Sequence, residues 1–285
     1  MTRQQKQTTY WAGYLDSPIA LDPTGIPKSM DTVILAFGGP NPDGSLDMSF
    51  FLGKHAEKDV LTGIRVLKAR GTTILLSLLD RPETHWDAID LDAFARDVAQ
   101  TAKAWGIDGV DIDAESGITN PKRYVDSFVA LGRALRSALP PSAPISYTCY
   151  LGAGSLDGQI IPALLGSVVD YVQLMAYFDD ADGMKALFED YATLVPPRRL
   201  LIGVKAGGSQ GTPLAEVKAL ATWVRARGAG GMMLWTINRD EPGYTGLPVA
   251  TFAATIAKGL MSPGKELFLQ AYSVMERYGD GYSHP

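Results

Sequence analysis

The segment Gly106-Ile-Asp-Gly-Val-Asp-Ile-Asp-Ala-Glu115 alternates acidic and apolar residues over its second half. Because successive side chains of a β-strand point to opposite faces, Asp111, Asp113 and Glu115 are predicted to share one face. The intervening apolar residues share the other face, which suits packing against helices. The segment therefore predicts a buried parallel strand whose acidic face points inward and ends at Glu115.

Seven further apolar runs of similar length recur along the chain. Each is rich in β-branched or aromatic residues and is bounded by Gly, Pro or Asp, as buried parallel strands are. Stretches with helical spacing lie between them, namely residues 56–70, 91–105, 121–139 and 213–227. Together with residues 109–115, the predicted strands are residues 10–15, 32–37, 73–78, 145–150, 171–177, 200–204 and 231–236.

Eight strands alternating with helices predict an α/β fold, and the number eight favours a closed (β/α)8 TIM barrel. An open, doubly wound sheet is the alternative, but the sequence lacks the Gly-rich phosphate-binding fingerprint of that fold. Barrels of roughly 250 residues often form one domain. We therefore expect a single catalytic barrel over residues 1–261, followed by a C-terminal tail of unassigned role over residues 262–285.

The composition of the chain excludes some classes of binding partner and indicates a cellular compartment. The 285 residues carry a net charge of −5, without the clusters of Lys and Arg that nucleic-acid binding requires. A single cysteine, Cys149, excludes an intrachain disulfide. The sequence has no run long and apolar enough to span a bilayer, and residues 1–9 are too polar for a secretory signal. As written, the chain is expected to be cytoplasmic, with export by another route left open.

The three predicted inward carboxylates are expected to titrate as a coupled set. Alternate residues of a strand lie about 6–7 Å apart, so these groups cannot all ionise at once. At least one proton is then retained near neutral pH, as a general acid requires. A site for Mg²⁺ or Ca²⁺ is the alternative, since both bind oxygen ligands. Zinc is disfavoured, because His55, His85 and His284 are not paired at ligand spacing.

The segment Asp108-Gly-Val-Asp-Ile-Asp-Ala-Glu115 resembles the DGxDxDxE signature of family-18 glycoside hydrolases. All five specified positions match, and the motif falls on the fourth predicted strand, as it does in that family. The family contains chitinases, endo-β-N-acetylglucosaminidases and some inactive sugar-binding members. The position of Glu115 is usually changed in the inactive members, whereas it is intact here.

Other strands carry weaker resemblances to the same family. The segment from Gln173 to Asp179 resembles its MxYD motif, with Tyr177 in place and the aspartate one residue late. The segment from Gly231 to Asn238 resembles MxWSIN, whose Trp forms the floor beneath the sugar at the cleavage site. Gly13-Tyr14 and Ala36-Phe37 resemble first-strand and second-strand segments of the family. The resemblance implies substrate-binding roles for Trp235, Tyr14, Phe37, Gln173, Met175, Asp179 and Asn238.

Two differences from long-barrel chitinases are visible in the sequence. Leu79 and Asp80 replace the two glycines of the family's third-strand SxGG segment. Only a short loop separates Lys205 from Pro213, where long-barrel chitinases insert an α+β domain. The chain therefore resembles the compact branch of the family, for which we expect a shallow, open cleft.

The resemblance also implies a retaining, substrate-assisted mechanism that uses no cofactor and no metal. Glu115 is expected to protonate the glycosidic oxygen, while the N-acetyl carbonyl of the substrate attacks the anomeric carbon. Asp113 orients the acetamido N–H, Asp111 shares a proton with Asp113, and Tyr177 holds the acetamido oxygen. The expected substrates are β-1,4-linked N-acetylglucosamine polymers or oligomers. An endo-β-N-acetylglucosaminidase acting on protein-linked glycans and a non-catalytic barrel that binds chitin oligomers are the alternatives.

Overall fold

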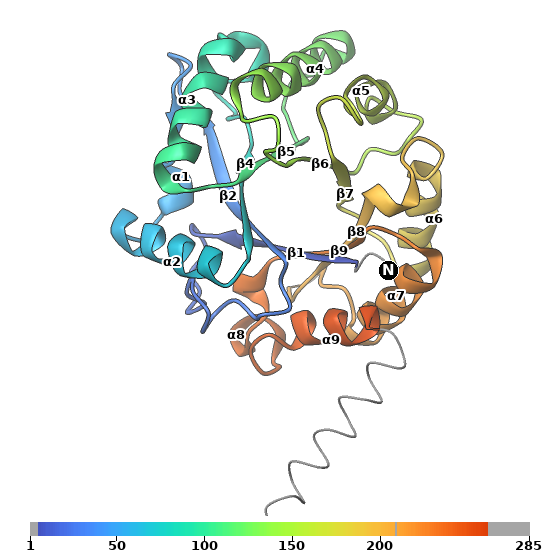
Figure 1. The fold of residues 1–285 in the computed structure, drawn as a ribbon. Helices are drawn as coiled ribbons and strands as arrows, with labels where there is room; N and C mark the ends of the chain where they lie inside the picture. The colour runs from blue at the N-terminus through green and yellow to red at the C-terminus, as the bar shows by residue number, and fades with distance from the viewer. Residues whose placement is uncertain (1–4, 209, 262–285) are drawn as a thin grey trace, which may run out of the picture.

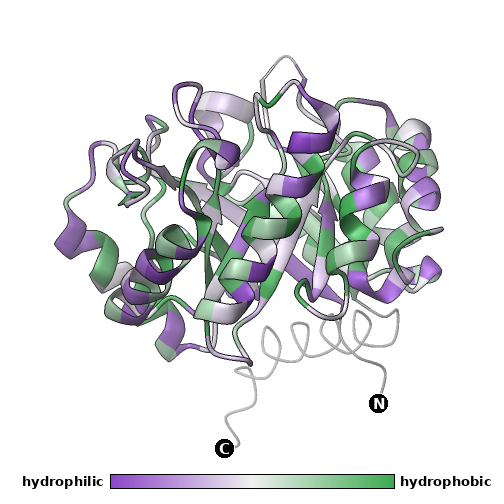
Figure 2. Cartoon of the chain, turned by 90° about the horizontal axis from the view of Figure 1, so that it is seen from above, coloured by the Kyte–Doolittle hydropathy of each residue, from purple (hydrophilic) through white to green (hydrophobic). Residues whose placement is uncertain are grey.

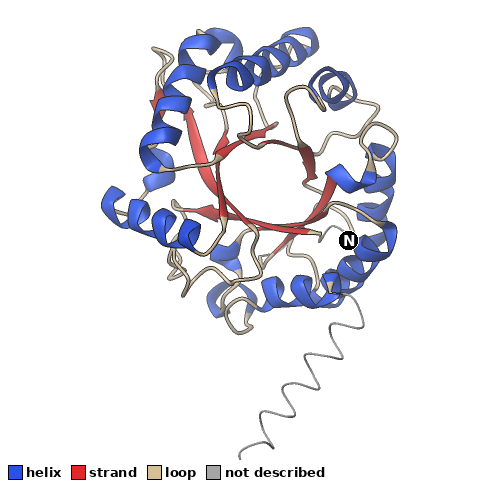
Figure 3. Cartoon of the chain, in the orientation of Figure 1, coloured by secondary structure: helices blue, strands red, loops and turns tan. Residues whose placement is uncertain are grey.

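Eight parallel strands close into a barrel in the computed structural model, which describes residues 5–208 and 210–261 (Figure 1). The strands follow the order β1-β9-β8-β7-β6-β5-β4-β2, and pairing of β1 with β2 closes the ring. Figure 3 shows the ring of strands enclosed by helices. The predicted TIM barrel is therefore confirmed, whereas the expected tail over residues 262–285 lies outside the described residues.

The barrel strands correspond one to one with the eight predicted runs. They are β1 (Lys6–Ala12), β2 (Thr32–Pro40), β4 (Thr73–Leu78), β5 (Gly109–Asp113), β6 (Ile145–Cys149), β7 (Tyr171–Leu174), β8 (Leu200–Lys205) and β9 (Gly231–Trp235). A two-residue strand, β3 (Leu46–Asp47), pairs antiparallel with β2 and was not predicted.

Helices follow the strands and cover the barrel from outside. They are α1 (Ser49–Leu52), α2 (Glu57–Ala69), α3 (Leu91–Trp105), α4 (Pro121–Ala138), α5 (Asp157–Leu164), α6 (Ala181–Tyr191), α7 (Leu214–Arg227), α8 (Pro242–Thr245) and α9 (Thr251–Leu260). Short 3-10 turns are η1 (Trp86–Ala88), η2 (Pro197–Arg199) and η3 (Ile237–Arg239). Among the described residues, none of these helices has the length and apolarity to cross a bilayer.

Local sequence signals set the helix ends. Asp90 caps α3 by accepting a hydrogen bond from Ala93 N, and Gly106 ends this helix at φ 72°, which favours glycine. Asn120 caps α4 in the same way, and Pro121 occupies its first turn. The strand that carries the acidic residues is thus held between two well-defined helices.

The core has an outer layer between strands and helices and a smaller inner layer within the barrel. Val110 and Ile112 of β5 are fully buried in the outer layer. The inner layer contains Tyr10, Leu75 and Met233 from three other strands. Figure 2 shows the helices as a mixture of hydrophobic and hydrophilic residues, as expected of helices between a core and water.

Candidate active site

The acidic residues of β5 lie on the inner face of the barrel. Asp111 and Asp113 are buried there, opposite in phase to the outward-facing Val110 and Ile112. Glu115 follows two residues after the end of the strand, at the mouth. The alternation predicted from the sequence therefore extends past the last paired residue of the strand.

Asp111 is surrounded by donors from the neighbouring strands. Its two oxygens accept five hydrogen bonds, which fills the acceptor capacity of the carboxyl group. The donors are Tyr10 Oη at 2.8 Å, Ser77 Oγ at 2.8 Å, Ser146 Oγ at 2.6 Å, Thr148 Oγ1 at 2.8 Å and Gln173 Nε2 at 3.5 Å.

Asp113 lies in the opposite kind of environment. Its Oδ1 atom is buried without a hydrogen-bond partner among the described residues. Burial raises the pKa of this carboxyl well above its ordinary value, and the nearby charges of Glu115 and Asp111 raise it further. We expected Asp111 and Asp113 to share a proton, but no hydrogen bond joins them within the described residues; the partners of Asp111 come instead from other strands.

Glu115 stands at the wall of the mouth, with part of its side chain in solvent. Desolvation of the carboxyl group by the surrounding pocket raises its pKa. A carboxyl with a raised pKa keeps its proton to higher pH, which is the property needed to protonate a leaving oxygen.

A pocket of about 250 Å³ opens at the carboxyl ends of the strands, beside these acids. Active sites of TIM barrels lie at this end. The pocket combines two carboxyl groups with a largely aromatic wall. It is lined by Tyr10, Tyr14, Phe37, Asp113, Glu115, Thr148, Met175, Tyr177, Phe178, Lys205 and Trp235.

Trp235 ends β9 and packs within an aromatic cluster of the pocket. Its ring stacks on Phe37 with centroids 5.7 Å apart, and it meets Tyr10 edge-on at 5.2 Å. The peptide bonds Ala36–Phe37 and Trp235–Thr236 are cis. These contacts fix the Trp235 ring in place, as a sugar-binding platform requires.

Comparison with known families adds to this geometry. The family model described as the endo-beta-N-acetylglucosaminidase EndoS TIM-barrel domain matches residues 16–211, which is more than half of the chain.

The chain belongs to the family-18 glycoside hydrolases.

Solved family-18 structures share the fold over nearly the whole chain. A chitinase from Bacteroides thetaiotaomicron is 13% identical with a TM-score of 0.76, covering 92% of this chain and 98% of that one. A GH18 chitinase from Pseudoalteromonas aurantia is 21% identical with a TM-score of 0.70, covering 89% and 99%. The catalytic domain 2 of the Ostrinia furnacalis Group II chitinase is 16% identical with a TM-score of 0.66, covering 88% and 95%. No curated protein matches the sequence.

Besides Asp111, which lies beneath the pocket, three of the predicted substrate-binding residues do not line it. Gln173 is fully buried beneath it, where its Oε1 accepts from Thr8 and its Nε2 donates to Thr148. Both ends of this amide are therefore engaged within the barrel, where Gln173 also contacts Asp111 on the acidic strand, and its contact with substrate stays a prediction.

Asn238 and Asp179 lie away from the pocket for different reasons. Asn238 is buried behind β9, where its Oδ1 accepts a 2.7 Å hydrogen bond from the backbone N–H of Ala12. Asp179 is exposed at the start of α6 and accepts from the backbone N–H of Asp180. The chain turns after Leu174, the last residue of β7, so the extra residue before Asp179 carries this carboxylate away from the mouth. Neither residue lines the pocket, and their substrate contacts stay predictions.

Four pocket residues were absent from the predicted site. Tyr10, Thr148 and Lys205 point inward by strand alternation, the same signal that identified the acidic residues. Phe178 lies after the end of β7, where alternation gives no information. The residue found where the family motif has an aspartate thus extends the aromatic wall instead.

Asp80, which replaces a glycine of the family's third-strand segment, lies in a polar cluster beside the catalytic candidates. Its Oδ2 accepts a 2.5 Å hydrogen bond from Ser116 Oγ and lies 3.1 Å from His85 Nδ1. Burial raises the pKa of Asp80, although these two partners oppose that effect. Because Ser116 directly follows Glu115, the cluster fixes the backbone that positions Glu115.

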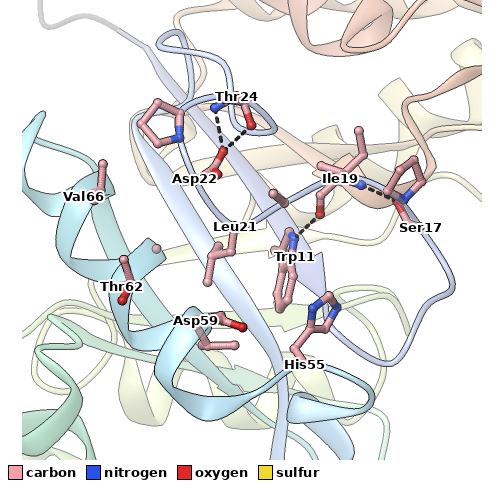
Figure 4. A pocket seen from close by; sticks show the side chains of 15 residues that line it. Trp11, Ser17, Ile19, Leu21, Asp22, Thr24, His55, Asp59, Thr62 and Val66 are labelled. Carbon is pink, nitrogen blue, oxygen red and sulfur yellow. Dashed lines mark hydrogen bonds between the residues drawn. The ribbon is translucent and has the colours of Figure 1, made fainter.

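A second pocket, of about 590 Å³, lies outside the barrel between residues 17–24 and α2 (Figure 4). Trp11 lies at its base and donates through Nε1 to Ile19 O at 3.0 Å. None of the catalytic candidates lines it. Within residues 5–208 and 210–261, no group of three or more His, Cys, Asp or Glu could hold a metal ion.

Proposed function

We propose that the chain hydrolyses β-1,4-linked N-acetylglucosamine oligomers or polymers by a retaining, substrate-assisted mechanism. The observation that carries the proposal is the pairing of a protonatable Glu115 with a buried, unpartnered oxygen of Asp113 in one aromatic pocket. The first group can donate a proton, and the second can accept a hydrogen bond from substrate.

In this mechanism Glu115 transfers its proton to the glycosidic oxygen as the bond to the anomeric carbon breaks. The carbonyl oxygen of the substrate's own N-acetyl group attacks the anomeric carbon and forms an oxazolinium ion. Water then attacks the same carbon, and Glu115, now ionised, accepts a proton from that water. The sugar leaves with its original anomeric configuration, because the two displacements each invert it.

Asp113 and Tyr177 position the acetamido group for this attack. The buried Oδ1 of Asp113 accepts the acetamido N–H, and in its ionised form this carboxyl group stabilises the positive charge of the oxazolinium ion. Burial and the charges of Asp113 and Glu115 raise the pKa of Tyr177 well above its ordinary value. The phenol therefore stays protonated and can donate to the acetamido oxygen.

The aromatic surfaces suit a neutral pyranose. Trp235 offers a ring on which the apolar C–H face of a sugar can pack, and Phe178 is 57% exposed at the rim. The Ostrinia furnacalis domain was crystallised with penta-N-acetylchitooctaose, (NAG)5. A chitin oligomer is accordingly the first substrate to test.

A second candidate is an endo-β-N-acetylglucosaminidase that acts on protein-linked glycans. It is favoured by the description of the matching family model, which is drawn from such an enzyme. It would use the same acids and the same mechanism, so only the leaving group and the remaining glycan would differ.

Incubation with chitin oligomers of four to six sugars and with a high-mannose glycoprotein, read by mass spectrometry, separates these functions. We expect shortened oligomers from the first substrate. Release of glycan from the glycoprotein alone would establish the second candidate. Binding of a chitin oligomer without cleavage after prolonged incubation would show a non-catalytic barrel and overturn the proposal.

A further inference from the structure

Lys205 brings a positive charge into the candidate active site. It is the last residue of β8 and alternates inward with Leu201 and Gly203, so its side chain projects into the mouth. It lines the pocket and lies in register with Trp235 on the neighbouring strand. A cation therefore lies directly beside the proposed sugar platform.

Arg239 supplies a second cation from the turn that follows β9. Its guanidinium carbon lies 5.6 Å from the ring centroid of Tyr244, and its Nε atom is buried without a hydrogen-bond partner from residues 5–208 or 210–261. Among the residues that the structure describes, neither Arg239 nor Lys205 takes part in an ion pair.

The two cations lie close together at the rim of the pocket, because Arg239 Nη1 comes within 3.7 Å of the position that a Cβ at Gly208, three residues after Lys205, would occupy. Burial lowers the pKa of Lys205, and the positive charge of Arg239 lowers it further. The same charge opposes the burial that raises the pKa of Tyr14 to about 12, and it acts on Tyr177 in the same direction. Arg239 is therefore an electrostatic neighbour of the pocket's tyrosines.

These cations do not neutralise the catalytic candidates. The pKa values of Asp113 and Glu115 are raised, and among the described residues neither acid forms an ion pair with Lys205 or Arg239. Two acids next to Arg239 in sequence are engaged elsewhere. Asp240 accepts from the backbone N–H groups of Phe252 and Ala253, and Glu241 accepts from Gly243 N. Two adjacent, unpaired cations repel each other, and a bound anion would relieve that repulsion.

We propose, as a refinement that rests on the proposed function, that Lys205 and Arg239 form a subsite for a carboxylate carried by the saccharide substrate. A planar carboxylate suits the forked donors of a guanidinium, with the ammonium as a second point of contact. A neutral chitin oligomer has no group that needs either cation.

The position of Lys205 restricts where that carboxylate can be. Because Lys205 lies in register with Trp235, the acidic group belongs to the sugar at the cleavage site or to its immediate neighbour. N-acetylmuramic acid, which bears a lactyl carboxylate and alternates with N-acetylglucosamine in peptidoglycan strands, has this arrangement. A terminal acidic sugar on a branched protein-linked glycan lies several sugars away from the cleavage point.

The test compares a tetramer of alternating N-acetylglucosamine and N-acetylmuramic acid with the N-acetylglucosamine tetramer. We expect the wild type to show kcat/KM about tenfold or more in favour of the acidic tetramer at low salt. The Lys205→Met/Arg239→Gln double variant should lose most of that ratio, and added salt should reduce it in the wild type. Lys218→Met, an exposed lysine on α7, controls for loss of a positive charge.

Binding measured by calorimetry with the Glu115→Gln variant tests the subsite without turnover. Equal affinity of the Glu115→Gln variant for the two tetramers would overturn the inference. A preference for the acidic tetramer that persists in the triple variant, which also carries the Lys205 and Arg239 changes, would overturn it too. Cleavage of the neutral tetramer in that case leaves the proposed function standing. Cleavage of neither tetramer by the wild type, with anion-dependent binding intact, would instead overturn the proposed function alone. Preference for a sialylated glycoprotein over both tetramers would place the carboxylate elsewhere and contradict the subsite.

Discussion

Asp111 accepts five hydrogen bonds, whereas the Oδ1 atom of Asp113, two residues further along the same strand, is buried and accepts none from the part of the chain that the structure describes. A buried acceptor without a partner costs free energy that the fold must supply elsewhere. Such a cost is expected where substrate completes the hydrogen bonding. The oxygens of the first carboxyl group are therefore fully occupied within the barrel, whereas the second has an oxygen available to a ligand.

The raised pKa of Asp113 predicts a pH-dependent effect on stability. In the unfolded chain an aspartate ionises near pH 3.9, whereas the folded protein holds this proton to higher pH. Between those values the folded state binds more protons, so the free energy of unfolding falls as pH rises. The Asp113→Asn variant has no proton to lose at this position. It therefore avoids a fall in the free energy of unfolding of about 1.4 kcal/mol for each unit by which the pKa of Asp113 is raised. Calorimetry should show a larger gain in Tm at pH 8 than at pH 4; equal changes at both pH values would contradict the assignment.

Tyr177→Phe should reduce turnover while leaving the fold intact. The phenol lies at the pocket, and its removal deletes one donor to the acetamido oxygen. Loss of one such donor costs about 10²- to 10³-fold in kcat where it acts at an oxyanion, and we expect a loss toward the lower end here. Steady-state rates on chitopentaose measure it. Unchanged kcat would remove Tyr177 from the mechanism.

Ser116→Ala should slow catalysis through the position of Glu115. The substitution removes the hydrogen bond to Asp80 and loosens the backbone next to the proposed acid. We expect kcat to fall about tenfold with little change in KM, because misplacement affects the reacting geometry more than binding. The control is Ser127→Ala on α4, which loses a hydrogen bond to Arg123 O away from the pocket, whereas Ser116→Ala loses the bond to Asp80 and the one accepted from Ile118 N. Equal activities of the two variants would show that Ser116 has no positioning role.

Hydrolysis should proceed at an unchanged rate in the presence of strong chelators. The proposed proton donor and the internal nucleophile need no Lewis acid, because the substrate carbonyl supplies the attacking oxygen. Rates with and without excess EDTA, after dialysis against chelator, measure this. A loss that Mg²⁺ or Ca²⁺ restores would favour the reading of the acidic strand as a cation site.

The fold and the inner face of the acidic strand could be predicted because both depend on short-range pattern. Eight apolar runs and an alternation of period two are visible in the sequence, and the structure places Asp111 and Asp113 inside the barrel as expected. The first strand begins at Lys6 rather than at residue 10, because the earlier residues pair with β9 despite their polar character.

The residues at the rim of the site could not be predicted as completely, because they lie beyond the ends of the strands. After β7 the chain turns, so Phe178 enters the pocket and Asp179 leaves it, a result that alternation does not determine. Gln173 has the inward direction that was predicted for it, yet depth along the strand places it under the pocket. Direction follows from local pattern, whereas depth depends on how neighbouring strands are staggered.

The central claim is that Glu115 donates the proton to the leaving sugar. The most direct measurement is kcat/KM for Glu115→Gln against the wild type on chitopentaose, with the fold checked by circular dichroism and Tm. A positioned acid contributes about 10²- to 10⁴-fold, so the account predicts a loss in this range with unchanged structure. Activity within a few-fold of the wild type would contradict it.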